Sequence, residues 1–204
     1  MGRVLDAIYK LAPDAMVIYT SDHGDMLGAH RLSSKNAAAY KEVANIPLII
    51  RRCKGSGKCM RWHLTLILHQ QLWNYFELPV PKKQWKVKSM LAQIMIQVLD
   101  NDAVFTEFTR YEVDHDGFGG LQMMRAITTK RYKLVIHLLD TDEFYDLETD
   151  PYEVENRIND EAYEAVRNEL HDKLLAHMDD TRDLYRGYQW KMRPWRKNCH
   201  TRLE

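Results

Sequence analysis

The first fifty residues alternate between apolar runs and polar turns in a way that predicts one helix and two strands. Apolar side chains recur at helical spacing over residues 3–12, and a Pro-Asp pair then ends that helix. Residues 15–20 form a continuous apolar run, typical of a strand in a sheet that is covered on both faces. Residues 46–50 predict the next strand, because Pro is tolerated where a strand begins. Helix, loop and strand form half of an α/β repeat, so we expect the chain to start inside an α/β domain.

The second half of the chain has the pattern of a small antiparallel sheet followed by a helix. Short strands are expected at residues 103–108, 124–129, 132–137 and 143–147, joined by tight turns. Residues 160–178 then place apolar side chains at helical spacing, which predicts a helix with one packing face. That face consists of Ala162, Tyr163, Val166, Leu170, Leu174 and Met178.

Composition narrows the class of protein only slightly. The 204 residues are 45% hydrophobic and 28% charged, and the formal net charge is zero. Such values are ordinary for globular proteins, and a neutral chain gives no reason to expect nucleic acid or an acidic membrane as partner. No apolar run approaches the roughly 20 residues of a membrane span, and no signal peptide is visible, so the compartment stays open. The three cysteines, Cys53, Cys59 and Cys199, show no repeating metal pattern; Cys53 and Cys59 could pair or bind a metal, but bystander thiols are favoured.

The most informative stretch follows the first predicted strand, where the sequence turns abruptly polar. Asp22 and His23 are adjacent oxygen and nitrogen ligands, and Gly24 and Gly28 allow the backbone to bend around what they hold. In α/β folds, ligands gather just beyond the carboxyl ends of strands. A simple turn, with Asp22 capping the next helix, is the structural alternative for so short a motif.

The residues around this motif resemble the sulfatase family of the alkaline phosphatase superfamily. The family pattern is a strand, Ser-Asp-His-Gly-Asp, Gly-x-His, a Lys, Tyr-x-Glu and a strand reading x-Pro-Leu-Ile-Ile. All of these occur here in that order, at residues 21–25, 28–30, 35, 40–42 and 46–50. Residues 144–151 are similar to the family's Leu-Tyr-Asp-Leu-x-x-Asp-Pro signature, with Phe in the first position. The resemblance covers about three quarters of the chain.

The resemblance implies an α/β fold in two parts. Residues 1–101 correspond to the C-terminal portion of an alkaline-phosphatase-like mixed-sheet catalytic domain, within which residues 51–101 are atypical. A local reading-frame slip is our hypothesis for that atypical segment. Residues 102–180 correspond to a subdomain with a four-stranded antiparallel sheet and a C-terminal helix. Residues 181–204 form an aromatic-basic tail, for which packing on the same protein is favoured over binding a nucleic acid strand.

The resemblance also implies roles for individual residues. Asp22 and His23 match half of the family's metal site, which suits Ca²⁺, with Mg²⁺ or Mn²⁺ as alternatives in phosphoesterase relatives. Lys35 matches the lysine that contacts the sulfate oxygens. His30 is expected either to line the pocket or to fix its loop. His115, in a polar glycine-rich loop, either faces substrate or belongs to an ordered hairpin connection.

The implied activity is metal-assisted hydrolysis of a sulfate ester, carried by a small molecule or a carbohydrate, through attack of a formylglycine. The family makes this nucleophile from Cys or Ser in a Cys/Ser-x-Pro-x-Arg motif, which these 204 residues do not contain. Paired aspartates of the family's N-terminal half are missing as well, and that half is a candidate partner. A phosphodiesterase or phosphonate monoester hydrolase is the nearest alternative. An inactive, truncated remnant is the other, and the chain alone is expected to be inactive.

Overall fold

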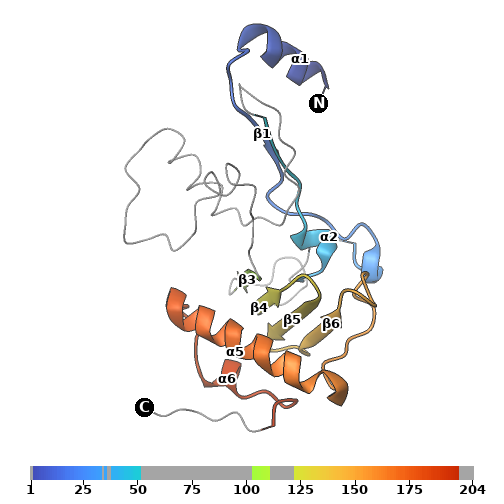
Figure 1. Cartoon of the computed structure of the whole chain (residues 1–204), viewed down its shortest axis with the longest axis vertical. Helices are drawn as coiled ribbons and strands as arrows, with labels where there is room; N and C mark the ends of the chain where they lie inside the picture. The colour runs from blue at the N-terminus through green and yellow to red at the C-terminus, as the bar shows by residue number, and fades with distance from the viewer. Residues whose placement is uncertain (1, 34, 36–37, 52–102, 111–121, 198–204) are drawn as a thin grey trace. The chain divides into compact units, whose positions relative to one another are not determined.

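The chain folds as two compact units (Figure 1). The residues that this computed structural model describes are 2–33, 35, 38–51, 103–110 and 122–197. The first unit consists of residues 1–24 and 45–99, and the second of residues 25–44 and 100–204. The domain boundaries expected at residues 101 and 180 stay a prediction.

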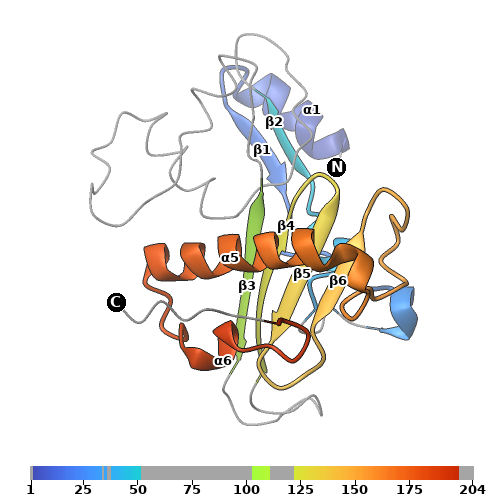
Figure 2. The same cartoon turned by 60° about the horizontal axis from the view of Figure 1, so that its bottom comes forward.

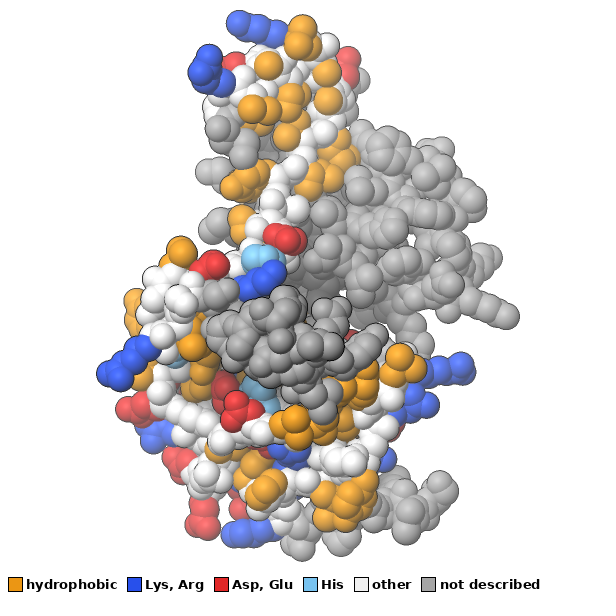
Figure 3. All heavy atoms as spheres, turned by 180° about the vertical axis from the view of Figure 1, so that it is seen from behind, with side chains coloured by type: hydrophobic (Ala, Val, Ile, Leu, Met, Phe, Trp, Pro, Cys, Tyr) orange, Lys and Arg blue, Asp and Glu red, His pale blue; other side chains and the backbone are white. Residues whose placement is uncertain are grey.

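In the first unit, the structure confirms the helix and the two strands. Helix α1 spans Gly2–Leu11, and strands β1 (Val17–Thr20) and β2 (Leu48–Arg51) pair antiparallel, with Val17 opposite Arg51. The expected cover on both faces is not found in the described part, because Tyr19 in β1 is 41% exposed. The two strands described in this unit have too few neighbours to bury both faces by themselves. Hydrophobic side chains accordingly gather on the surface of α1 (Figure 3).

The second unit contains the predicted antiparallel sheet. Its strands are β3 (Val104–Arg110), β4 (Gln122–Thr128), β5 (Tyr132–His137) and β6 (Glu143–Asp146), arranged in that order. Each strand pairs antiparallel with the next along the chain. The β4–β5 turn is closed by Thr129, whose backbone N–H donates to the carbonyl of Tyr132 over 2.8 Å. The β4–β5 and β5–β6 connections are short, as expected for strands that follow one another in an antiparallel sheet.

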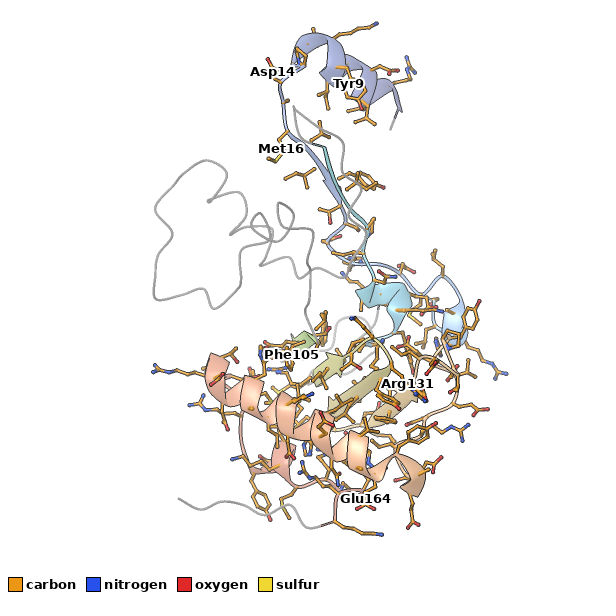
Figure 4. The ribbon with its side chains drawn as sticks, viewed as in Figure 1. Tyr9, Asp14, Met16, Phe105, Arg131 and Glu164 are labelled. Carbon is orange, nitrogen blue, oxygen red and sulfur yellow. The ribbon has the colours of Figure 1, made fainter. Side chains whose placement is uncertain are left out.

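The predicted helix lies across one face of this sheet (Figure 2). Asp160 accepts a hydrogen bond from the N–H of Ala162 over 3.0 Å and so caps the short 3₁₀ helix η2 (Glu161–Tyr163), which leads into α5 (Glu164–Thr181). Glu164 and Phe105, labelled in Figure 4, mark the start of α5 and the strand β3 that it crosses. The core between sheet and helix contains Met123, Ile127, Leu134, Ile136, Phe144, Ile158, Leu170, Leu174, Met178 and Trp190.

The opposite face of the sheet carries a second, smaller cluster. It consists of Ala39, Met124, Ala126 and Val135, with Phe108 packed against them. Ala39 belongs to the segment that connects the 3₁₀ helix η1 (Ala29–Arg31) to helix α2 (Lys41–Ala44). A segment from early in the chain therefore covers the sheet face that α5 leaves open, which brings candidate residues of the polar loop onto the second unit.

The tail packs back on its own chain as far as it is described, which confirms the favoured interpretation. Trp190, in the short helix α6 (Tyr188–Lys191), is 2% exposed and belongs to the core. Tyr185 and Trp195 pack against that core, whereas Tyr188 is 63% exposed. Large aromatic side chains supply much buried area for a short segment. No helix among the described residues is long and apolar enough to cross a membrane.

Candidate active site

Asp22 and His23 lie directly after β1, where the apolar strand gives way to a polar loop. Oδ2 of Asp22 is 3.7 Å from Nε2 of His23. Nδ1 of His23 is 2.6 Å from the carbonyl oxygen of Gly24, so this nitrogen carries the proton and donates it. Nε2 thus lies on the side of the carboxylate, where a neutral imidazole with its proton on Nδ1 could present a lone pair to a cation.

Local hydrogen bonds hold the pair in place. The hydroxyl of Ser21 donates to the carbonyl of His23 over 2.7 Å, and the N–H of His23 donates to Oδ1 of Asp22 over 3.0 Å. This arrangement differs from the alternative in which Asp22 caps the next helix, because η1 is preceded by Gly28 and has no side-chain cap. Oδ1 of Asp22 is thus bound within its own turn, while Oδ2 faces the imidazole.

The pair fits part of a cation site. A carboxylate oxygen and an imidazole nitrogen 3.7 Å apart can both reach one divalent ion. Ca²⁺ takes six to eight oxygen ligands, however. Within the described ranges, no group of three or more His, Cys, Asp and Glu side chains could hold a metal. Asp22 and His23 therefore satisfy two positions of a larger site, and the metal stays a prediction.

His30 occupies a tightly wound loop of the second unit. Leu27, Gly28, His30 and Arg31 have positive φ angles of 45°, 95°, 50° and 61°, and only glycine adopts such angles without strain. The ring of His30 stacks on the ring of Tyr40, with centroids 3.9 Å apart and planes 10° from parallel. The contact is consistent with a loop-fixing role, and a role toward substrate stays a prediction.

The candidate residues are divided between the two units. Lys35 is exposed between η1 and α2, in the second unit, to which His30 also belongs. Asp22 and His23 belong to the first unit, so the grouping of all four into one site stays a prediction. His115 lies outside the described residues, as does the atypical segment from residue 52 to residue 101.

The structure adds a buried charge pair that the sequence pattern did not predict. Lys133 on β5 forms an ion pair with Glu153, and the side chains are 2% and 0% exposed. Lys133 Nζ also donates to the carbonyl of Ala39 over 2.7 Å, and Glu153 Oε2 accepts from the N–H of Lys41 over 2.8 Å. One signal was present in the sequence, since strand alternation places Lys133 on the same face as Val135, which is buried.

Tyr40 also belongs to a series of polar side chains that contact one another. The hydroxyls of Tyr40 and Tyr145 are hydrogen-bonded, and that of Tyr145 donates to Oε2 of Glu143 over 3.0 Å. Burial, followed by the negative charge of Glu143, raises the pKa of both tyrosines. His137 Nε2 lies 3.3 Å from Oε1 of the same glutamate. All four side chains lie on the part of the second unit that carries Ala39.

The signature at residues 144–151 has a structural role in this arrangement. Arg131, labelled in Figure 4, donates to Asp146 through Nε at 3.1 Å and Nη2 at 2.9 Å. These hydrogen bonds hold the pKa of Asp146 below its usual value, against the effect of burial. Asp150 accepts from the N–H groups of Val154 and Glu155 over 2.7 and 2.8 Å. The two aspartates therefore shape the turn that presents Glu153.

Comparison with known proteins decides the family. The model of the family described as N-sulphoglucosamine sulphohydrolase, C-terminal, matches residues 28–180. The chain belongs to the sulfatase family. Uncharacterized sulfatase YidJ of Escherichia coli (strain K12) is 39% identical over 206 residues, covering 99% of this chain and 40% of that protein. Delta 4,5-hexuronate-2-O-sulfatase of Bacteroides thetaiotaomicron is 28% identical, covering 90% of the chain and 40% of the relative. The chain thus spans about two fifths of the length of these relatives.

Solved structures confirm the fold class. The structure of BT4656, in complex with its substrate D-glucosamine-2-N,6-O-disulfate, superposes with a TM-score of 0.75 at 24% identity. The superposition covers 91% of this chain and 38% of the BT4656 chain. The phosphonate monoester hydrolase of Agrobacterium radiobacter gives the same TM-score at 24% identity, over 88% and 38% of the two chains. The sulfatase chain therefore has the expected alkaline-phosphatase-like α/β architecture with its four-stranded antiparallel sheet.

Proposed function

We propose that this sulfatase-family chain contributes to hydrolysis of a sulfate ester assisted by a divalent cation. The observation that carries the proposal is the Asp22–His23 pair, with Oδ2 3.7 Å from Nε2 and with Nδ1 donating to a backbone carbonyl. A hard oxygen ligand beside an oriented imidazole suits such a cation. Membership of the family supports the same chemistry.

Each candidate residue has a definite task in this proposal. Asp22 and His23 would hold the cation, with Ca²⁺ favoured over Mg²⁺ and Mn²⁺. When bound, the cation would offset the negative charge that builds up on the reacting oxygens. Lys35 would direct its three ammonium donors at the peripheral sulfate oxygens. His30 would line the pocket from its fixed loop, and His115 would approach the substrate from the segment between β3 and β4.

No residue of the chain is assigned as the nucleophile. The 204 residues contain no Cys/Ser-x-Pro-x-Arg motif, from which a formylglycine could be made. The residues present therefore do not fit that group, and no attacking step is assigned to them. We expect the 204-residue chain to bind a cation and sulfate weakly and to show no turnover by itself.

Carbohydrate sulfates are the substrate class that the relatives favour. One relative is a hexuronate-2-O-sulfatase, and one structural neighbour is bound to a disulfated glucosamine. A phosphonate or phosphodiester substrate is the second candidate, and the phosphonate monoester hydrolase with a TM-score of 0.75 supports it. A carboxylate, an imidazole and a lysine serve both reactions, because sulfate and phosphate esters present similar negative oxygens.

A calcium titration tests the metal pair. Isothermal titration of the metal-free chain with Ca²⁺ should give weak binding that Asp22→Ala and His23→Gln each reduce by roughly tenfold or more, a factor typical of lost ligand-shell groups. Asp14→Ala is the matched control, because Asp14 is an exposed carboxylate of the same unit. Equal affinities in all four proteins would remove the cation site from the proposal.

An activity assay tests the substrate class and the expected inactivity together. The chain and its Asp22→Ala variant are offered an aryl sulfate and an aryl phosphonate monoester. Hydrolysis by the chain that disappears in Asp22→Ala would overturn the expected lack of turnover, and the preferred ester would then decide between the two substrate classes. An absence of turnover with both esters is the expected result.

A further inference from the structure

The loop that carries His30 needs an external support. Three residues other than glycine, Leu27, His30 and Arg31, have left-handed backbone angles within five positions. Such strain persists only where surrounding contacts determine it, and it gathers at functional sites. Inside the loop, the N–H of Gly28 donates to the carbonyl of Leu32 over 2.9 Å. From outside the loop, the ring of Tyr40 stacks on the imidazole of His30, with the ring centroids 3.9 Å apart.

Tyr40 is held by hydrogen bonds to the backbone on both sides of it. The residue before it, Ala39, accepts from Lys133 Nζ over 2.7 Å, and the residue after it, Lys41, donates its N–H to Glu153 over 2.8 Å. Because Lys133 and Glu153 also form a buried ion pair, the two anchors are tied to each other. An apolar contact would allow this segment to slide, whereas two directed hydrogen bonds fix which residue lies between them.

The side chain of Tyr40 is fixed at its far end as well. Its hydroxyl is hydrogen-bonded to Tyr145, which in turn donates to Glu143 over 3.0 Å. The ring therefore has hydrogen bonds at its hydroxyl, an imidazole on its face and anchored backbone on either side. A tyrosine constrained in this way has little freedom to move relative to the sheet.

Stability alone is a poor reason for these anchors. Replacing a buried ion pair by apolar side chains of similar volume is often neutral or stabilising. Glu153 also has a positive φ of 57°, which a residue other than glycine adopts only with strain. The buried charges of Lys133 and Glu153 thus both bond to the three-residue segment from Ala39 to Lys41, whose central side chain stacks on His30.

We propose that Tyr40 is a positioning residue, which holds the imidazole of His30 in the orientation that the site uses, and that Lys133, Glu153 and Tyr145 anchor Tyr40 for this task. The use of His30 toward sulfate rests on the proposed function. The stacking of His30 on Tyr40 does not depend on the proposed function, so the stacking and the role of His30 toward sulfate can be tested separately. This role accounts for the tyrosine of the Tyr-x-Glu motif, to which the sulfate chemistry assigns no task.

The experiment follows the His30 ring by NMR in the full chain, with and without inorganic sulfate. Stacking on an aromatic face shifts the imidazole C–H signals of His30 upfield. Tyr40→Leu should abolish that shift and weaken the sulfate response of His30 by roughly fivefold to tenfold, the factor that corresponds to releasing one strained residue. Tyr40→Phe keeps the ring but loses the hydrogen bond to Tyr145, so it should keep the upfield shift and weaken the sulfate response less than Tyr40→Leu does. Tyr188→Leu, at an exposed tyrosine of α6, should change neither.

Each outcome has a distinct meaning. An unchanged His30 signal in a folded Tyr40→Leu protein overturns the positioning role, as does a sulfate response equal to that of the wild type. If Tyr40→Leu does not fold, Tyr40→Phe decides, because loss of the upfield shift with the ring still present would also overturn it. Absence of any sulfate response in the wild type counts against the proposed function, while the upfield shift and its loss in Tyr40→Leu still support the positioning role.

Discussion

The guanidinium of Arg125 lies against the carboxylate of Asp183, with Nε 2.6 Å from Oδ2 and Nη2 3.1 Å from Oδ1. Both side chains are 3% exposed. The pair joins β4 to the segment that follows α5, and Nη1 of Arg125 also donates to the carbonyl of Phe108 over 3.0 Å. Burial raises the pKa of Asp183, but hydrogen bonds from Arg125 and from the N–H of Tyr185 outweigh it, so the pKa lies below its usual value.

Removing one member of this pair should be costly. Asp183→Ala leaves the Arg125 charge buried without its partner, so we expect the free energy of unfolding to fall by about 3–5 kcal/mol. The double variant Arg125→Met/Asp183→Leu should lose less, because no charge then remains buried. Urea denaturation measures both, with Asp179→Ala as an exposed control on α5. An Asp183→Ala cost no larger than that of the control would contradict the argument.

Asp142 should control how firmly the tail is held. Its carboxylate accepts from Arg193 Nε and Nη2, each over 2.6 Å, from Trp195 Nε1 over 2.7 Å and from the N–H of His137 over 2.9 Å. Asp142→Asn removes the charge and replaces one acceptor by a donor, so tryptic cleavage after Arg196, in the same tail, should become faster. Asp140→Asn, at a neighbouring exposed carboxylate, is the control. Equal cleavage rates in the two variants would refute this assignment.

Much of the fold could be predicted because its elements have clear local periods. The strand over residues 103–108 and the helix from residue 164 onward follow from alternation and from helical spacing, which depend only on near neighbours. The apolar run alone does not predict the exposure of Tyr19, since such a run looks the same in a buried strand and in an exposed one, but the shortage of neighbouring strands does, because a helix and two strands cannot bury both of their faces. Strand alternation hinted at the buried position of Lys133, but its pairing with Glu153 could not be predicted, because Glu153 lies twenty residues further along the chain.

The candidate site was predictable only where its residues are adjacent. Asp22 and His23 are neighbours in sequence, so their proximity needed no tertiary contact. The stacking of His30 on Tyr40 depends on a loop with several positive φ angles. Among the residues of that loop with positive φ, Gly28 is the one whose residue type favours such an angle. Tertiary contacts of this kind leave no periodic signal, which is why the anchors of Tyr40 emerged only from the structure.

Loss of the cap that Asp160 provides, before the helix that covers the sheet, should lower the stability by a smaller amount. Oδ1 of Asp160 accepts from the N–H of Ala162 over 3.0 Å, which satisfies one of the donors that a helix start leaves unpaired. Asp160→Ala should lower the free energy of unfolding by about 1 kcal/mol. Glu161→Gln, at the next exposed position, should change it far less. Thermal unfolding followed by circular dichroism compares the two, and equal melting temperatures would count against the cap.

His171 makes the stability of the second unit depend on pH. Its side chain is fully buried, with Nε2 2.7 Å from the carbonyl of Trp190 and Nδ1 2.7 Å from Nη1 of Arg196. Burial first, and then the charge of Arg196, lower the pKa of His171 to about 4, against the opposing effects of the Trp190 hydrogen bond and of nearby Asp172 and Asp142. The imidazole is therefore neutral, donates through Nε2 and accepts through Nδ1.

The sign of the pH effect follows from this lowered pKa. Between the unfolded value of about 6.5 and the folded value of about 4, the unfolded chain binds a proton at His171 that the folded chain excludes. The free energy of unfolding should therefore fall as the pH drops through this range, by roughly 3 kcal/mol in the limit. His171→Gln keeps a donor for Trp190 and cannot titrate, so its urea midpoint should lose this dependence, whereas His177→Gln should retain it. A wild-type slope in His171→Gln would show that the proton is bound elsewhere.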